Sequence, residues 1–168
     1  TRDPDATLAE RLVMRLQKTV SQRVDTRVRI LTLCRRQVRD CTVPIVTLMA
    51  GRHDPYLVLI SCILSLRTQD KTTGAACRRL FDQAATPRAM AALSAATVAK
   101  LIYPVGFYRT KARVLVDISA ALCDRWQGQV PATRDALLSL KGVGRKTANL
   151  VLGLGFSIPA ICVDTHVH

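Results

Sequence analysis

The sequence lacks several features that define whole classes of protein. It has no Cys-X-X-Cys pair, so a zinc ribbon is not indicated. No run approaches the roughly 20 apolar residues that a membrane-spanning helix needs, and the N-terminal region has no uninterrupted apolar stretch of the signal-peptide kind. These absences predict an intracellular protein without a membrane partner, in the cytoplasm or nucleoid of a bacterium or in the nucleus or a mitochondrion of a eukaryote.

Alternation of apolar and polar residues, the pattern of a half-buried strand, is also missing over any useful length. Apolar residues instead recur at helical spacing, as at Leu8, Leu12 and Leu16. The sequence therefore predicts an all-α fold. The expected helices cover residues 7–37 (as one helix or two), 55–66, 70–82, 87–90, 92–103, 108–126, 133–140 and 145–154.

The stretch 55–66 is apolar on nearly every side, which is typical of a buried central helix. Asp54 is suited to cap this helix, and Pro55 to occupy its first position. We assign residues 51–168 to a helical core domain and residues 1–50 to an N-terminal helical segment. The short apolar stretch around Pro44 is expected to lead into the loop at residues 51–55.

The six cysteines do not form a recognisable ligand set or disulfide framework. Most lie inside apolar runs, where a free cysteine packs as a small hydrophobic residue in a reducing compartment. We therefore predict no metal site in this chain and a structural role for all six: Cys34, Cys41, Cys62, Cys77, Cys123 and Cys162.

Positive charge is in excess throughout, with 25 Lys and Arg against 12 Asp and Glu and a formal net charge of +13. The excess is interleaved with apolar residues, as on folded amphipathic helices. It favours a polyanionic partner, of which nucleic acid is the usual one. A ribosomal protein, a heparin binder or a membrane-surface protein has a similar balance, so charge alone leaves these classes open.

Residues 133–154 predict two short helices joined by the turn Lys141-Gly142-Val143-Gly144. Glycine permits a positive φ and a close approach of another backbone, and the N-terminus of the second helix attracts phosphate. Spacing alone leaves open an ordinary hairpin and a clamp for the DNA backbone. A nucleotide-binding P-loop is disfavoured, because neither its GxxxxGK[ST] pattern nor a preceding strand is present.

The segment Leu138-Ser139-Leu140-Lys141-Gly142-Val143-Gly144-Arg145-Lys146-Thr147-Ala148 resembles the helix-hairpin-helix of the endonuclease III family, whose pattern is LPGVGRKTA. Val163-Asp164-Thr165-His166 matches the family's VDTH, Val105–Ala112 its IGxYxxKA loop, and Leu64–Asp70 the exit of its central helix. The motifs occur in the family's order over about residues 54–168. The resemblance implies a helix-hairpin-helix glycosylase fold, with a core of six-helix type.

The resemblance implies two catalytic residues. Lys146 stands at the family's nucleophilic lysine, which attacks the deoxyribose C1′ as a neutral amine. Asp164, 18 residues later, matches the family's catalytic carboxylate, and could also serve as a helix N-cap. The function implied is a bifunctional DNA glycosylase and AP lyase for oxidised pyrimidines, acting as a monomer on duplex DNA with damaged bases or abasic sites.

The resemblance also implies DNA-binding residues. Phe107 aligns with an apolar residue that the family inserts into the base stack, although a core aromatic would show the same pattern. Arg67 replaces a glutamine that fills the gap left by the flipped base, and His166 has no settled role. The expected DNA-binding set is Lys141, Gly142, Val143, Gly144, Arg145, Thr147, Phe107, Arg67 and His166.

The end of the sequence departs from the family. Family members continue past VDTH through further helices, usually with a C-x6-C-x2-C-x5-C set that binds a [4Fe–4S] cluster. This chain lacks those cysteines, so we expect no cofactor on it and an incomplete second domain, with apolar surface exposed on residues 7–37. The chain is then a fragment or a shortened copy. The alternatives are a non-catalytic DNA-binding remnant, a mismatch-specific glycosylase, which Lys146 disfavours, and an RNA-binding structural protein, which the motifs disfavour.

Overall fold

The computed structural model describes residues 21–22, 24–34, 36, 43–51 and 54–163. The chain divides into two compact units, Thr1–Thr42 and Val43–His168. In the first unit the described residues are helical, and large apolar side chains such as Val28 and Leu31 are more than half exposed. The expectation that a further part of the protein covers residues 7–37 stays a prediction.

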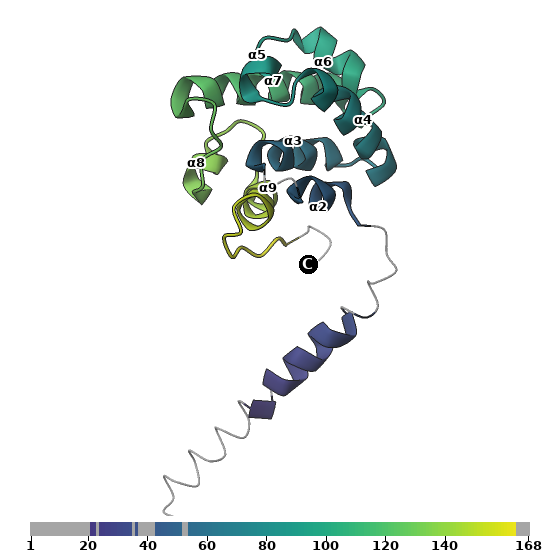
Figure 1. The fold of residues 1–168 in the computed structure, drawn as a ribbon, viewed down its shortest axis with the longest axis vertical. Coiled ribbons are helices and arrows are strands. Elements are labelled where there is room, and N and C mark those ends of the chain that lie inside the picture. Colours follow the sequence, from purple (N-terminus) through teal and green to yellow (C-terminus); the bar gives the residue numbers. More distant parts are fainter. Residues whose placement is uncertain (1–20, 23, 35, 37–42, 52–53, 164–168) are drawn as a thin grey trace, which may run out of the picture. The chain divides into compact units, whose positions relative to one another are not determined.

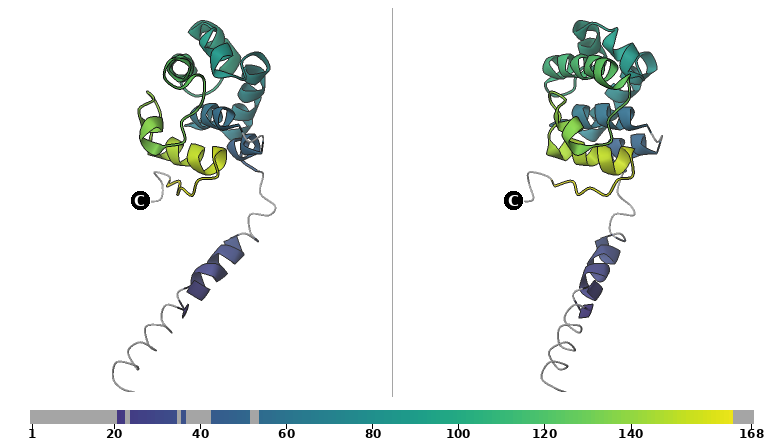
Figure 2. Two further views of the ribbon diagram at one scale, coloured as in Figure 1. Left: turned by 60° about the vertical axis from the view of Figure 1, so that its left-hand side comes forward. Right: turned by 90° about the vertical axis from the view of Figure 1, so that its left-hand side faces the viewer.

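Helix α3 (Pro55–Ser65) is the centre of the second unit. Nine consecutive residues, Tyr56 to Leu64, are buried, which confirms the predicted central helix. The Asp54 carboxylate accepts a hydrogen bond from the backbone N–H of Tyr56 at 2.8 Å, as predicted for the N-cap. Figures 1 and 2 show α3 between α2 (Ile45–Ala50) and α9 (Arg145–Leu150) on one side and the helices of residues 70–126 on the other.

The remaining core helices follow the predicted order. They are α4 (Asp70–Gln83), α5 (Pro87–Ala91), α6 (Ala95–Ile102) and α7 (Tyr108–Trp126). The predicted helix over 92–103 begins three residues late, because the Ser94 hydroxyl accepts a hydrogen bond from the Thr97 N–H at 3.1 Å and caps α6 there. Helix α7 packs against α5 and α6.

Helix α2 was not predicted, because six residues are too few to show a helical period. Ile45, Val46 and Met49 are buried, and α2 packs against α3. The Asp70 carboxylate, in the first turn of α4, accepts a hydrogen bond from the Ile45 N–H at 3.0 Å. Tertiary contacts therefore stabilise this helix, as is usual for short ones.

The hairpin consists of α8 (Arg134–Leu138) and α9, and it replaces the longer helices predicted over 133–140 and 145–154. After Leu150 the backbone continues as a π-helical turn, Val151–Gly155. Gly155 lies against α3, where a Cβ would come within 3.0 Å of the Pro55 Cα. The described residues contain helices and no strand, which confirms the all-α prediction.

Candidate nucleic-acid interface and active site

The two glycines of the hairpin turn serve different purposes. Gly142 has a φ of +89°, and a Cβ there would lie 2.8 Å from Val114 Cγ1 on α7, so the fold itself requires glycine at this position. Gly144 has a φ of −97° and a ψ of 175°, which any residue can adopt, and nothing lies within 4 Å of its Cβ position. The space beside Gly144 is therefore open to another molecule.

The N-terminus of α9 is exposed at this open side. The first N–H groups of an α-helix have no partner within the helix and carry its positive dipole end. Gly144 supplies no side chain to cap them, and the side chains of Lys141 and Arg145 are exposed on either side. Thr147 and Val143 are buried and support the turn from within. The arrangement suits an anion such as a backbone phosphate.

Lys146 is the second residue of α9 and is half-buried. It lies close enough to Cys62 of α3 for its positive charge to act on the thiol: burial raises the Cys62 pKa to about 12, and Lys146 opposes that rise. The predicted nucleophile is therefore between the exposed hairpin turn and the buried central helix. Asp164 and His166 lie outside the described residues.

Asn149 connects α9 to the segment that leads towards Asp164, a role that no pattern in the sequence indicates. It follows Lys146 by three residues, so the two side chains share a face of the helix. Its Nδ2 donates a hydrogen bond to the Ile161 carbonyl at 2.7 Å, while its Oδ1 is buried without a partner. The bond therefore holds the backbone at Ile161, three residues before Asp164 in the sequence, against α9.

Arg67 and Phe107 come from different loops but meet at the surface. Arg67 follows α3, Phe107 precedes α7, and the Arg67 Cζ lies 5.1 Å from the centroid of the Phe107 ring. Phe107 is 62% exposed, so it is not the core aromatic of the alternative interpretation. Phe107 and Val114, which contacts Gly142, are about 10 Å apart along α7. The loops and the hairpin turn are therefore neighbours on one scaffold helix.

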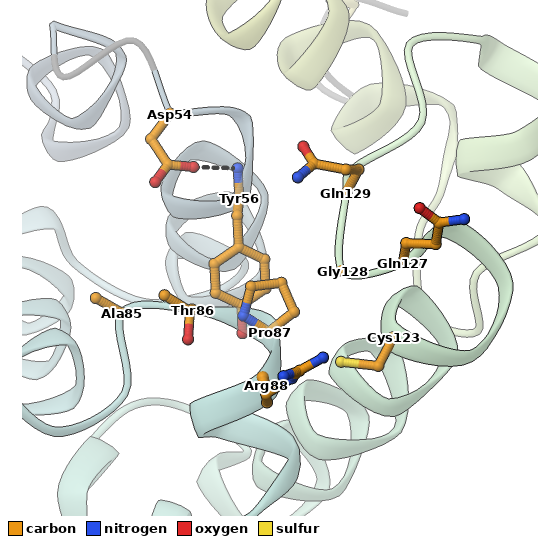
Figure 3. A pocket seen from close by; sticks show the side chains of 10 residues that line it. All are labelled: Asp54, Tyr56, Ala85, Thr86, Pro87, Arg88, Cys123, Gln127, Gly128 and Gln129. Atoms are coloured by element: carbon orange, nitrogen blue, oxygen red, sulfur yellow. Dashed lines mark hydrogen bonds between the residues drawn. The ribbon is translucent and has the colours of Figure 1, made fainter.

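A pocket of about 540 Å³ lies elsewhere in the unit, between the start of α3, the start of α5 and the end of α7 (Figure 3). Two of its polar side chains already form structural hydrogen bonds. Asp54 caps α3, and the Tyr56 hydroxyl shares a hydrogen bond of 2.8 Å with Ser119. None of the described residues that the sequence predicts for catalysis or DNA binding lines it. We therefore place the candidate site at the hairpin rather than in this pocket.

The described cysteines do not form a metal site. Cys62 and Cys77 are buried in the core, Cys123 is half-buried, and Cys34 and Cys162 are exposed; all five are free thiols. No group of three or more His, Cys, Asp or Glu gathers within the described part of the chain. These residues do not fit the [4Fe–4S] cluster that the family resemblance implies for longer members. Within the same ranges, no helix has the length and apolar character needed to cross a membrane.

Comparison with known proteins agrees with this geometry. Residues 60–168 match the model of the HhH-GPD superfamily base excision DNA repair proteins. Endonuclease III of Thermotoga maritima is 48% identical over 115 residues, which are 68% of this chain and 54% of that protein. The chain thus spans about half the length of this relative.

Two solved structures are also similar to this chain. A trapped endonuclease III–DNA covalent intermediate shares 37% identity with a TM-score of 0.65, covering 79% of this chain and 65% of that one. A thermostable thymine-DNA glycosylase shares 25% identity with a TM-score of 0.75, covering 86% of this chain and 65% of that one. The chain therefore belongs to the HhH-GPD superfamily of base excision DNA repair proteins, and the resemblance to the endonuclease III family is confirmed.

Proposed function

We propose that this protein removes oxidised pyrimidines from duplex DNA and cleaves the resulting abasic site, as a DNA glycosylase and AP lyase. The observation that carries the proposal is the position of Lys146: half-buried, in the first turn of α9, next to an open hairpin turn that suits a phosphate. A lysine so placed can reach a sugar whose phosphate is bound at the turn. An ordinary lysine on the solvent-exposed face of a helix would be neither half-buried nor next to a phosphate site.

In the proposed reaction the Lys146 amine attacks C1′, and the bond from C1′ to the base breaks as the base leaves with a proton. Opening of the C1′–O4′ bond gives a Schiff base between C1′ and the Lys146 nitrogen. Removal of a C2′ proton then expels the 3′ phosphate by β-elimination. Hydrolysis releases the sugar aldehyde and restores the amine. Asp164 is proposed to stabilise positive charge at C1′ and to assist proton transfer.

DNA binding is proposed to combine two surfaces. The hairpin turn, with Lys141 and Arg145, holds the backbone through phosphate contacts, which makes affinity sensitive to salt. Arg67 and Phe107 enter the base stack where the damaged nucleotide leaves it, as a flipped base requires. His166 completes the proposed set near the lesion.

The lesion class is tested with duplexes that differ in one base. We expect release of thymine glycol at a rate at least about tenfold above release of thymine from a G·T mispair, under single-turnover conditions measured as free base released from the DNA. The similar thermostable thymine-DNA glycosylase makes the mispair the appropriate competitor. Faster release of thymine from the mispair would contradict the proposed substrate and favour a mismatch-specific glycosylase.

Asn149 is predicted to support catalysis by holding the chain that leads to Asp164. Asn149→Leu removes the hydrogen bond to the Ile161 carbonyl but also the buried Oδ1 that has no partner, so the two effects on stability offset each other to within about 1 kcal/mol. We expect the single-turnover lyase rate to fall by about tenfold or more, because misplacing a catalytic group by about 1 Å has effects of this size. An unchanged rate at an unchanged melting temperature would contradict the positioning role.

A further inference from the structure

Arg67 and Phe107 share an unusual backbone conformation. Their φ values are +53° and +58°, in the left-handed region that side chains other than glycine rarely adopt. Such a conformation costs about 1 kcal/mol or more, and it persists only where the surroundings hold it in place. The structure therefore contains something that holds both residues, which belong to loops 40 positions apart in the sequence.

Lys111 of α7 is that support. Its Nζ donates hydrogen bonds to the carbonyls of Leu64 at 2.9 Å and Leu66 at 2.5 Å, and to the Thr68 hydroxyl at 3.2 Å. Carbonyls at the C-terminal end of a helix have no helical partner, so the ammonium group satisfies the end of α3. Its three donors hold residues on both sides of Arg67.

The same network continues to the Phe107 loop. The Thr68 hydroxyl accepts a second hydrogen bond, from the Gly106 N–H at 3.1 Å. A Cβ on Gly106 would lie only 2.7 Å from the Arg67 carbonyl oxygen, so the two loops are in direct contact. The backbone N–H of Lys111 itself donates to the Phe107 carbonyl at 2.9 Å. One lysine thus connects the residues before and after Arg67 to the residue that precedes Phe107.

Stability alone does not account for a lysine at this position. Lys111 is only 8% exposed, and burial lowers its pKa to about 8. No carboxylate among the described residues contributes to that shift. A buried cation without an ionic partner works against folding at neutral pH, where it must carry its charge. Its three hydrogen bonds are directed at one feature, the junction of the two loops.

We infer that Lys111 is a positioning residue for DNA recognition: it holds the Arg67 and Phe107 loops in one arrangement, so that both side chains enter the base stack as a unit. The inference rests on the proposed function, because the pair acts only on a duplex with a damaged or missing base. Lys111 itself touches neither the DNA nor the reacting atoms. Loss of the Lys111 side chain should weaken recognition of a damaged or missing base while leaving the affinity for undamaged duplex DNA in place.

The test compares Lys111→Met with Lys100→Met, which removes a lysine exposed on α6. Hydrogen exchange of the Thr68 and Gly106 amides, measured without DNA, should accelerate by about tenfold or more in Lys111→Met only, because opening of the loops becomes easier. The second readout is the fluorescence of 2-aminopurine opposite a tetrahydrofuran abasic-site analogue at saturating protein. The rise seen with the parent protein should fall to about half or less, because loops that are open for part of the time no longer hold both side chains in the base stack.

Gly106→Ala provides a second route to the same result, because its Cβ forces the loops apart while Lys111 stays in place. It should reduce the fluorescence rise as Lys111→Met does, with circular dichroism confirming that both variants are folded. Parent exchange rates in Lys111→Met would overturn the inference, and so would accelerated exchange with an unchanged fluorescence rise. Failure of the proposed function is a separate outcome, which would show as no strand cleavage by the parent protein. In that case the hydrogen-exchange measurement still decides whether Lys111 holds the loops.

Discussion

Gly142→Ala is expected to lower the free energy of unfolding by about 2 to 4 kcal/mol, from the left-handed backbone and the overlap with Val114. Gly144→Ala, two residues away, should lower it by less than about 1 kcal/mol, because its backbone is extended and the space around it is open. Urea unfolding followed by circular dichroism measures both values. The pair is matched, since each variant adds one methyl group to the same turn.

DNA binding should show the reverse pattern at a temperature where both variants are folded. A methyl group on Gly144 occupies the open space through which a phosphate reaches the N–H groups of α9, so affinity for duplex DNA should fall by about tenfold. Gly142→Ala should bind more nearly like the parent, because its Cβ points at α7. Equal loss of stability in both variants, or parent-like binding by Gly144→Ala, would contradict the assignment of the turn as the phosphate site.

The elements with strong local signals were predictable. Asp54 and Pro55 open a helix that is apolar on nearly all sides, and the structure buries Tyr56 to Leu64 as expected. The hairpin turn was located because two glycines, at 142 and 144, separate two helical patterns, and Gly142 adopts the positive φ that glycine permits. The resemblance to a family then assigned chemistry to Lys146, which helical periodicity alone would have left as a surface lysine.

Features that depend on tertiary contacts were not predictable. Helix α2 forms because Ile45, Val46 and Met49 pack on the core, and six residues carry no period of their own. The change to a π-helical turn at Val151 has no signal in the residue types. In the sequence Lys111 is indistinguishable from other helical lysines, because its role depends on the end of α3 lying next to it in the fold. The hydrogen bond from Asn149 to Ile161 likewise depends on the path of the chain after the π-helical turn.

Lys146→Ala is expected to have the largest effect on function, because the proposed reaction passes through a covalent bond to this nitrogen. Removing a nucleophile leaves binding in place and abolishes the covalent step. Lys141→Ala is the matched control: it removes an exposed lysine from the same turn, weakens phosphate binding, and leaves the amine of Lys146 intact. At saturating DNA the control should therefore still react.

The proposed covalent step through Lys146 is tested by trapping with sodium borohydride on a duplex that contains one abasic site. Borohydride reduces a Schiff base to a stable amine, so a lyase and its DNA migrate together on a denaturing gel. We expect a covalent adduct with the parent protein and with Lys141→Ala, and none with Lys146→Ala. An adduct of undiminished yield with Lys146→Ala, or no adduct with a parent protein that is folded and binds DNA, would contradict it.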